Sequence, residues 1–153
     1  MKLTEHKRKW IQDKVVHYCS LLQVEVPTLL LTRKEYKLHK EVIRQETGYT
    51  RVGSSPSRVY GTCNRKRKVI FLHVKKTPNS KWLDDTIRHE LIHYAKPSYN
   101  HHSPEFRDRM KLLKKGRIVN GRFTRKGRCI DNGQTIIQSM SEVVINEPVT
   151  CIQ

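Results

Sequence analysis

The sequence predicts an α+β fold in a single domain. Its 153 residues are the length of one domain. In several long segments the apolar residues recur at spacings of three and four, which is typical of helices that pack one face against a core. Short apolar runs bounded by Gly, Pro or Asn lie between these segments and are typical of strands. We therefore expect a compact domain of helices packed on a small antiparallel sheet, followed by a C-terminal β meander.

The first third of the chain predicts a helix, a strand and a second helix. Residues 4–22 predict a core-facing helix, because their apolar side chains form one stripe. The members of this stripe are Trp10, Ile11, Val15, Tyr18, Cys19 and Leu22. Pro27 ends the helical pattern, and residues 28–32 predict a short buried strand. Residues 33–46 predict a more polar helix that stops at Gly48.

The middle of the chain predicts a β-hairpin. Residues 53–57 contain Gly, Pro and three Ser and predict a loop. Two strands are expected after it, at residues 58–61 and 68–74, with the turn at residues 64–67. We expect residues 69–74 to form a sheet edge, to which an extended peptide can add as a further strand.

Two more helices are expected after the hairpin. The third helix begins at Asn79 or Ser80, either of which can cap it, and ends before Pro97. Its inward face consists of Leu83, Ile87, Leu91 and Ala95. The fourth helix begins at Ser103, whose hydroxyl can act as the cap, and Pro104 occupies the first helical position.

The last part of the chain has a different pattern. Gly116 ends the fourth helix, and short β-like runs follow, separated by Asn120-Gly121, Lys126-Gly127 and Asn132-Gly133. Asn-Gly is a strong signal for a hairpin turn. The sequence thus predicts a core of residues 1–116 and a β-rich extension, residues 117–153, packed on the same domain.

The chain is strongly basic. It has 31 Lys and Arg against 14 Asp and Glu, which gives a net charge of +17 with the eight His neutral. Basic side chains that meet phosphates release condensed counterions, so this excess favours nucleic acid as a partner. No apolar stretch approaches the roughly 18 residues that a membrane-spanning helix needs. We therefore expect a monomeric cytoplasmic protein with no membrane partner.

The four cysteines do not form a recognisable pattern. Cys19, Cys63, Cys129 and Cys151 are scattered and include no C-x-x-C pair. Neither a disulfide framework nor a zinc ribbon is therefore predicted, and we expect reduced thiols that pack as small apolar side chains.

The third helix contains His89-Glu90-Leu91-Ile92-His93, an H-E-x-x-H motif. Two histidines four residues apart project from the same side of a helix, so both imidazoles can reach one Zn²⁺. The glutamate between them can address a water molecule on the same ion. The two histidines also lie off the apolar face of this helix, which favours a metal site.

A zinc site with one open position needs a third protein ligand. The metzincin spacing fails, because Lys96 and Tyr99 occupy the positions of its Gly and third His. His102 is preferred, nine residues after His93, since it directly precedes the cap of the fourth helix. The alternatives left open are His101, Glu105 and Asp108.

These motifs resemble the SprT/Spartan-type zinc metallopeptidases over about residues 4–115. The resemblance rests on the H-E-L-I-H-Y helix, on the H-S-P-E-F segment at residues 102–106, and on Gly61-Thr62-Cys63 with the strand at 69–72. Two departures are the lack of a cysteine-rich ribbon after the catalytic core and a longer segment at residues 33–57.

The resemblance implies a mini-gluzincin-like zincin fold. It also implies that His89, His93 and His102 bind Zn²⁺, that Glu90 is the general base, and that the protein cleaves DNA-bound or DNA-crosslinked proteins. The residues alone give the same chemistry, since zinc held by three imidazoles lowers the pKa of bound water towards about 7. Tyr94, Tyr99 and Arg88 are candidates for stabilising the oxyanion, and none is assigned.

We therefore expect a zinc-dependent metallopeptidase that acts on a protein or peptide substrate near nucleic acid. One alternative is a non-catalytic basic nucleic-acid-binding protein in which the H-E-x-x-H site is structural or accidental. A second alternative is a zinc hydrolase that acts on a substrate other than a peptide.

Overall fold

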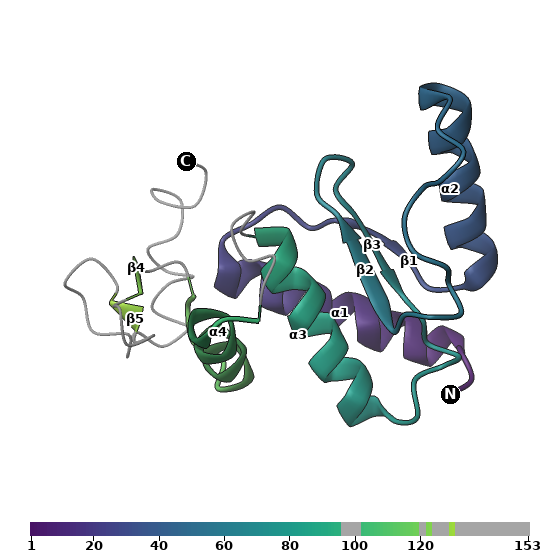
Figure 1. The fold of residues 1–153 in the computed structure, drawn as a ribbon. Helices are drawn as coiled ribbons and strands as arrows, with labels where there is room; N and C mark the ends of the chain where they lie inside the picture. Colours follow the sequence, from purple (N-terminus) through teal and green to yellow (C-terminus); the bar gives the residue numbers. More distant parts are fainter. Residues whose placement is uncertain (96–101, 120–121, 124–128, 131–153) are drawn as a thin grey trace.

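The computed structural model describes residues 1–95, 102–119, 122–123 and 129–130 of the chain. These residues form helices and strands in a mixed α and β order (Figure 1). The elements are α1 (Glu5–Leu22), β1 (Thr28–Leu30), α2 (Arg33–Thr47), β2 (Gly61–Asn64), β3 (Val69–Leu72), α3 (Ser80–Ala95), α4 (Pro104–Lys114), β4 (Arg122–Phe123) and β5 (Cys129–Ile130). The α+β class is confirmed.

The helix ends are fixed by local capping. The Thr4 hydroxyl accepts the Lys7 N–H at 3.1 Å at the start of α1. At the start of α2, Thr32 and Glu35 form a capping box, in which each side chain accepts a backbone N–H of the other residue. Gly48 ends α2 with a φ of +73°, which glycine adopts without steric cost. Both helices match the predicted ranges within one residue at each end.

The three-stranded sheet is mixed, with the order β1-β3-β2. β2 and β3 form the expected hairpin and pair antiparallel, with Gly61 opposite Leu72. β1 pairs with β3 in parallel, with Thr28 opposite Val69, so the prediction of a wholly antiparallel sheet is wrong. The physical reason is the connection. α2 leads the chain away from the end of β1 and residues 48–60 return it, so β2 starts there and runs antiparallel to β1, and the hairpin then makes β3 parallel to β1 (Figure 1).

Two predictions about the hairpin are also wrong. β3 lies between β1 and β2, so it is not the sheet edge that we expected to bind a peptide. Among the strands that the structure describes, the edges are β1 and β2. The first hairpin strand begins at Gly61 and not at residue 58, because a turn that starts at Pro56 bonds the Arg58 N–H to the Ser55 carbonyl at 3.0 Å.

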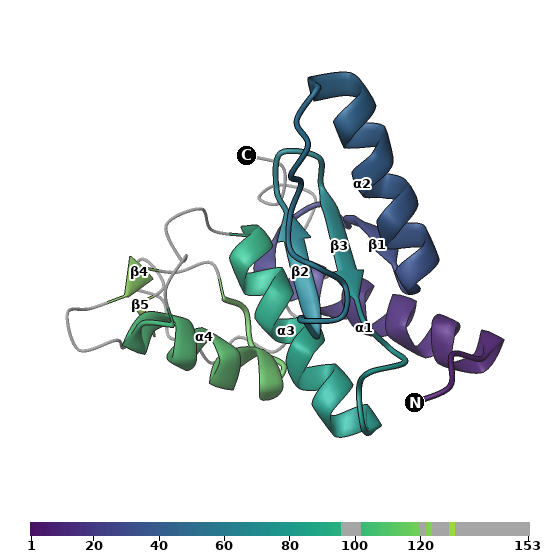
Figure 2. The same ribbon diagram turned by 45° about the vertical axis from the view of Figure 1, so that its right-hand side comes forward.

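The sheet separates two layers of helices (Figure 2). On one face, Ile70 and Leu72 of β3 join a core built from the apolar sides of α1 and α3. On the other face, the Phe71 ring stacks on Tyr36 of α2, with centroids 4.3 Å apart. This division follows from the strand period, since successive side chains point to opposite faces. Leu83, Ile87 and Leu91 of α3 are buried in the core, as predicted.

The segment that follows α4 is joined to α1. The Val119 N–H donates to the Leu21 carbonyl at 2.9 Å, and Val119 is buried. Beyond it, β4 and β5 pair antiparallel, with Arg122 opposite Ile130. The predicted meander therefore includes one antiparallel pair, and residues 131–153 lie outside the described residues. Within the described part of the chain, no helix is long and apolar enough to cross a membrane.

Candidate metal centre

Helix α3 positions two of the three predicted ligands. Its first turn is fixed by Asn79, whose side-chain oxygen accepts the Trp82 N–H at 2.9 Å. Because the Leu83, Ile87 and Leu91 face is buried in the core, the opposite side of the helix turns outward. His89 and His93 lie on that side, one turn apart and half-buried.

Helix α4 positions the third. The Ser103 hydroxyl accepts the Phe106 N–H at 3.3 Å, and Pro104 follows it in the first turn. His102 directly precedes this cap and is exposed. The cap fixes the backbone beside His102, so its ring is held against α3.

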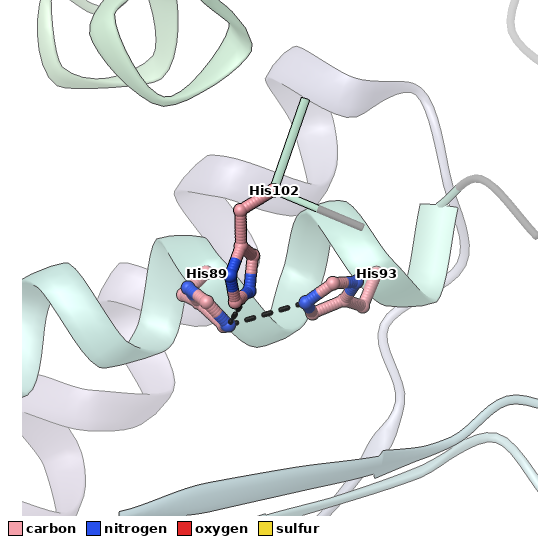
Figure 3. A group of neighbouring side chains, drawn as sticks. All are labelled: His89, His93 and His102. Carbon is pink, nitrogen blue, oxygen red and sulfur yellow. Dashed lines mark hydrogen bonds between the residues drawn. The ribbon is translucent and has the colours of Figure 1, made fainter. Parts of the chain in front are cut away.

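The three imidazoles converge on one point (Figure 3). The Nε2 atom of His89 lies 3.1 Å from Nε2 of His93 and 3.2 Å from Nε2 of His102. One nitrogen from each ring lies within 4.8 Å of the other two. Tetrahedral coordination at about 2.1 Å places ligand nitrogens roughly 3.4 Å apart. The observed separations from His89 agree with this value to a few tenths of an ångström.

The arrangement also fits a cation better than a hydrogen-bond network. A ring nitrogen offers one proton or one lone pair. Nε2 of His89 has two imidazole nitrogens within hydrogen-bond distance and can form a strong hydrogen bond with only one of them. An ion between the rings binds all three lone pairs. The residues present therefore fit a metal ion held by three histidines.

The Phe106 ring contacts all three imidazoles. Its ring centroid lies 4.9 Å from that of His89, 4.7 Å from that of His93 and 5.1 Å from that of His102. Phe106 is 3% exposed and belongs to the core cluster, so its position is fixed by packing. Sequence reasoning quoted this residue within H-S-P-E-F but gave it no role. Its position three residues after the capping Ser103, beside His102, is a signal that could have found it.

Burial sets the protonation state of His89. Burial, together with the neighbouring His93 and His102, lowers the pKa of His89 to about 4. The imidazole is therefore neutral at neutral pH, and the neutral form is the one that binds a metal.

Glu90 lies beside the histidines in a buried position. It is 8% exposed, and burial raises the pKa of its carboxyl to about 7. A cavity of about 460 Å³ adjoins it, lined partly by Tyr60, Trp82 and Met110. This carboxyl can exchange a proton near neutral pH with a group that enters the cavity.

Gly61 provides the space for this carboxylate. A Cβ atom at position 61 would lie 2.8 Å from Cγ of Glu90 and 3.1 Å from Oε1 of the same side chain. Sequence reasoning named Gly61 as part of a strand and missed its approach to α3. The pairing of two segments 29 residues apart leaves no local signal beyond the glycine itself.

The alternative ligands either do not belong to the histidine group or lie outside the described residues. Within the described residues, the side chains that together could hold a metal are the three histidines, and neither Glu105 nor Asp108 belongs to this group. Asp108 lies 4.0 Å from the Lys111 ammonium. His101 lies outside the described residues, as does Tyr99, one of the oxyanion candidates.

The other oxyanion candidates have different neighbours. Arg88 is 2% exposed, and its guanidinium is paired with the carboxylates of Asp84 and Asp85 on its own helix. Tyr94 directly follows His93 near the C-terminal end of α3 and is half-buried. The arrangement of Arg88 is explained by structural ion pairs.

The predicted thiols are free where the structure describes them. Cys19 is buried in the core and Cys63 is half-buried on β2. Burial raises the pKa of both thiols to about 12, so both are protonated at neutral pH. The side chains of Cys129 and Cys151 lie outside the description.

Comparison with known proteins gives no relative. No protein-family model, curated protein or solved structure matches this chain.

Proposed function

We propose that this protein is a zinc-dependent metallopeptidase of the SprT type with a zincin fold. The observation that carries the proposal is the convergence of three imidazoles from α3 and α4 next to the buried carboxyl of Glu90. Three histidines are a ligand set that zinc accepts while it keeps a position open for solvent.

In this proposal His89, His93 and His102 hold the ion. Zinc, when bound there, supplies Lewis-acid activation of a water molecule and of the scissile carbonyl. Glu90 accepts a proton from the attacking water at its carboxylate and delivers it to the leaving amine as the C–N bond breaks. A carboxyl placed at the reacting atoms can act first as the general base and then as the general acid.

The neighbouring elements give a peptide a place to bind. The backbone of β2 has no partner on its outer side among the described strands. An extended peptide that pairs with this edge passes close to Glu90, because Gly61 of β2 contacts that side chain. The 460 Å³ cavity can take one of its side chains beside the rings of Tyr60 and Trp82, which contact each other with centroids 5.5 Å apart.

We further propose that the basic surface brings the enzyme to nucleic acid, so that its substrates are DNA-associated proteins. The net charge of +17 supports this part of the proposal. The same charge also supports the alternative, a nucleic-acid-binding protein without catalysis.

The test is a Glu90→Gln variant assayed for zinc content, for cleavage of an unstructured protein such as casein, and for DNA binding. We expect one zinc per chain in both proteins and a loss of cleavage of about 10²–10⁴-fold in the variant, the usual contribution of a general base. Glu105→Gln is the matched control, since this glutamate lies on α4 outside the histidine group. Zinc-loaded wild type that binds DNA but cleaves no peptide bond would favour the alternative.

A further inference from the structure

A second cavity lies on the other face of the sheet from the metal centre. α2 meets the β2–β3 hairpin at two places: the Tyr36 ring stacks on Phe71, and Glu46 forms an ion pair with Arg67 in the hairpin turn. Figures 1 and 2 both show α2 and the hairpin turn extending side by side from the same end of the molecule. Between the two contacts a cavity of about 470 Å³ remains.

The polar part of this cavity is basic. His39, Lys40, Arg65 and Lys66 line it, and no Asp or Glu is among the described residues that do. Lys40 is 9% exposed, and its ammonium donates to the Ser54 carbonyl at 3.0 Å, which leaves two of its protons available. Within the described residues, Lys40, Arg65 and Lys66 form no ion pair with an acidic side chain. The Nε–H of Arg65 donates to the Tyr94 carbonyl at 3.0 Å, which leaves the two terminal NH₂ groups for an anion.

The surroundings do not neutralise this charge. Residues 33–68 contain eleven Lys and Arg and three Glu, a net charge of +8. Each glutamate already has a partner, because Glu35 caps α2, Glu41 pairs with Arg44, and Glu46 pairs with Arg67. A buried ammonium without a counter-charge is unfavourable, and an anion in the cavity removes that cost.

The wall of the cavity also contains a buried nitrogen atom without a hydrogen-bond partner. Nε2 of His39 is shielded from solvent and makes no hydrogen bond within the described residues. Burial followed by the charge of Arg67 lowers the pKa of His39, and burial followed by Arg44 lowers that of Lys40. Both shifts have the direction expected in a desolvated basic pocket.

The floor of the cavity is apolar. Ile43 comes from α2, and Val69 and Phe71 come from β3. A nucleotide has the matching character, since its phosphate is anionic and its base has an apolar face. Bases in a duplex are stacked and paired, whereas those of a single strand are free to enter a pocket.

We propose that this cavity binds one nucleotide unit of single-stranded nucleic acid, with its phosphate at Lys40, Arg65 and Lys66 and its base on the apolar floor. The inference rests on the proposed association with nucleic acid and specifies where it occurs. Thr62 and Cys63 of β2 line the cavity, and the preceding Gly61 contacts Glu90. A strand bound here thus lies across β2 from the metal centre.

The test is a titration of fluorescein-labelled (dT)15 with the full, zinc-loaded chain. Binding is measured by fluorescence anisotropy at several salt concentrations. We expect Arg65→Ala and Lys66→Ala each to weaken binding about tenfold and to reduce the salt slope by about 0.7, the value for one lost phosphate contact on a single strand. Lys114→Ala is the matched control, because it removes the same charge from an exposed position on α4. Equal losses in Lys66→Ala and Lys114→Ala would overturn the assignment, since they would indicate diffuse attraction.

A variant that keeps the charge tests the cavity itself. Thr62 lies opposite Phe71 in the hairpin and lines the cavity, so Thr62→Phe fills it without changing the charge. We expect weaker (dT)15 binding by this variant, provided that circular dichroism shows an unchanged fold. If Thr62→Phe does not fold, the exposed Arg65 and Lys66 variants still decide the question.

Competition separates the sources of the phosphate. We expect thymidine monophosphate to displace (dT)15 at lower concentration than inorganic phosphate does, and a 15-base-pair duplex to bind more weakly than (dT)15. Equal competition by the two phosphates would remove the base from the proposal. A polyglutamate peptide that binds as tightly, with the same loss in Lys66→Ala, would overturn it.

These titrations need no cleavage, so their failure leaves the proposed peptidase untouched, and a failed cleavage assay leaves them valid.

Discussion

Gly61 of β2 lies directly against the Glu90 side chain of α3. A Cβ at position 61 would come within 2.8 Å of Cγ of Glu90 and within 3.1 Å of Cγ2 of Thr86. Real Cβ atoms do not approach other carbons so closely, so any larger residue at position 61 must displace the carboxylate or the strand. The position of the proposed general base thus depends on a residue in the sheet.

The first prediction concerns this contact. In Gly61→Ala the added methyl group displaces Glu90, so peptide cleavage should fall while zinc content stays at one per chain. Overpacking should also lower the free energy of unfolding by about 1–3 kcal/mol. Steady-state kinetics and urea unfolding measure the two effects.

Gly48→Ala is the control for that experiment. Gly48 has a φ of +73° and no atom near its missing Cβ, so alanine there strains the backbone and lowers stability without touching the metal centre. Cleavage by Gly48→Ala at a temperature well below its unfolding midpoint should equal that of the wild type. Equal cleavage by Gly61→Ala would show that the contact does not position Glu90.

The second prediction concerns zinc and stability. A ligand that binds only the folded chain stabilises it by about 2.7 kcal/mol at 100 times its Kd, which is roughly 5–10 °C in the unfolding midpoint for a chain of this size. We expect this rise on addition of Zn²⁺ to metal-free wild type, measured by calorimetry. His89→Ala, His93→Ala and His102→Ala should each abolish most of it.

His6→Ala is the matched control, since His6 is exposed on α1 and belongs to no metal-binding group among the described residues. Its zinc-dependent rise should equal that of the wild type. A full rise in His102→Ala would exclude this residue as the third ligand.

The third prediction concerns Phe106, which contacts all three imidazoles. Phe106→Ala should lower the free energy of unfolding by about 3–5 kcal/mol. It should also weaken zinc binding about tenfold or more, the usual cost of losing a group that orients metal ligands. Competition with a chromophoric chelator measures the zinc affinity.

Leu113→Ala separates the two effects of that substitution. Leu113 is buried on α4 and belongs to the same core, so its loss should cost about 2–5 kcal/mol. Its zinc affinity should nonetheless stay near that of the wild type. Equal weakening in both variants would mean that Phe106 acts through stability alone.

The fourth prediction concerns the pH dependence of stability. Burial tends to raise the pKa of Glu35, but hydrogen bonds from the Leu31 and Thr32 N–H groups and the charge of Arg8 outweigh it and hold the pKa below its usual range. A carboxyl with a lowered pKa stabilises the fold above its ordinary value of about 4.3, and this contribution is lost as the pH falls through the lowered value.

Glu35→Gln should therefore be less stable than the wild type at pH 7, and the difference should shrink as the pH falls below the ordinary carboxyl value. Urea unfolding across this range measures it. Glu41→Gln, which removes an exposed partner of Arg44 on the same helix, should show a much smaller difference at pH 7. A difference for Glu35→Gln that does not shrink as the pH falls would contradict the role of the charge.

The sequence predicted the helices well because their signals are local. Gly48 and Ser103 lie at helix ends through backbone angles or hydrogen bonds within a few residues, as the sequence predicted. Thr32 was assigned to the preceding strand, and the structure shows that it caps α2. The strand order was not predictable in the same way. The parallel pairing of Thr28 with Val69 joins segments about forty residues apart, and nothing in either short run specifies its neighbour.

The candidate site likewise combines features that have a local sequence signal with features that do not. The spacing of His89 and His93 and the position of His102 before a cap predicted the histidine group. In the structure, Nε2 of His93 lies 3.1 Å and Nε2 of His102 lies 3.2 Å from Nε2 of His89. The packing of Phe106 beneath the rings depends on how α4 lies against α3, which is a tertiary property. The basic cavity was equally hidden, because its wall combines α2 with a hairpin turn.

The small number of buried side chains on α2 has a consequence for its local stability. α2 buries only Tyr36, Lys40 and Ile43 among its described side chains, whereas α1 and α3 bury long apolar stripes. Elements with few buried contacts open at free energies well below that of global unfolding. Amide deuterons should therefore enter α2 by local fluctuations before they enter α3. The α2 wall of the basic cavity can thus open locally while α3, which carries His89 and His93, stays folded.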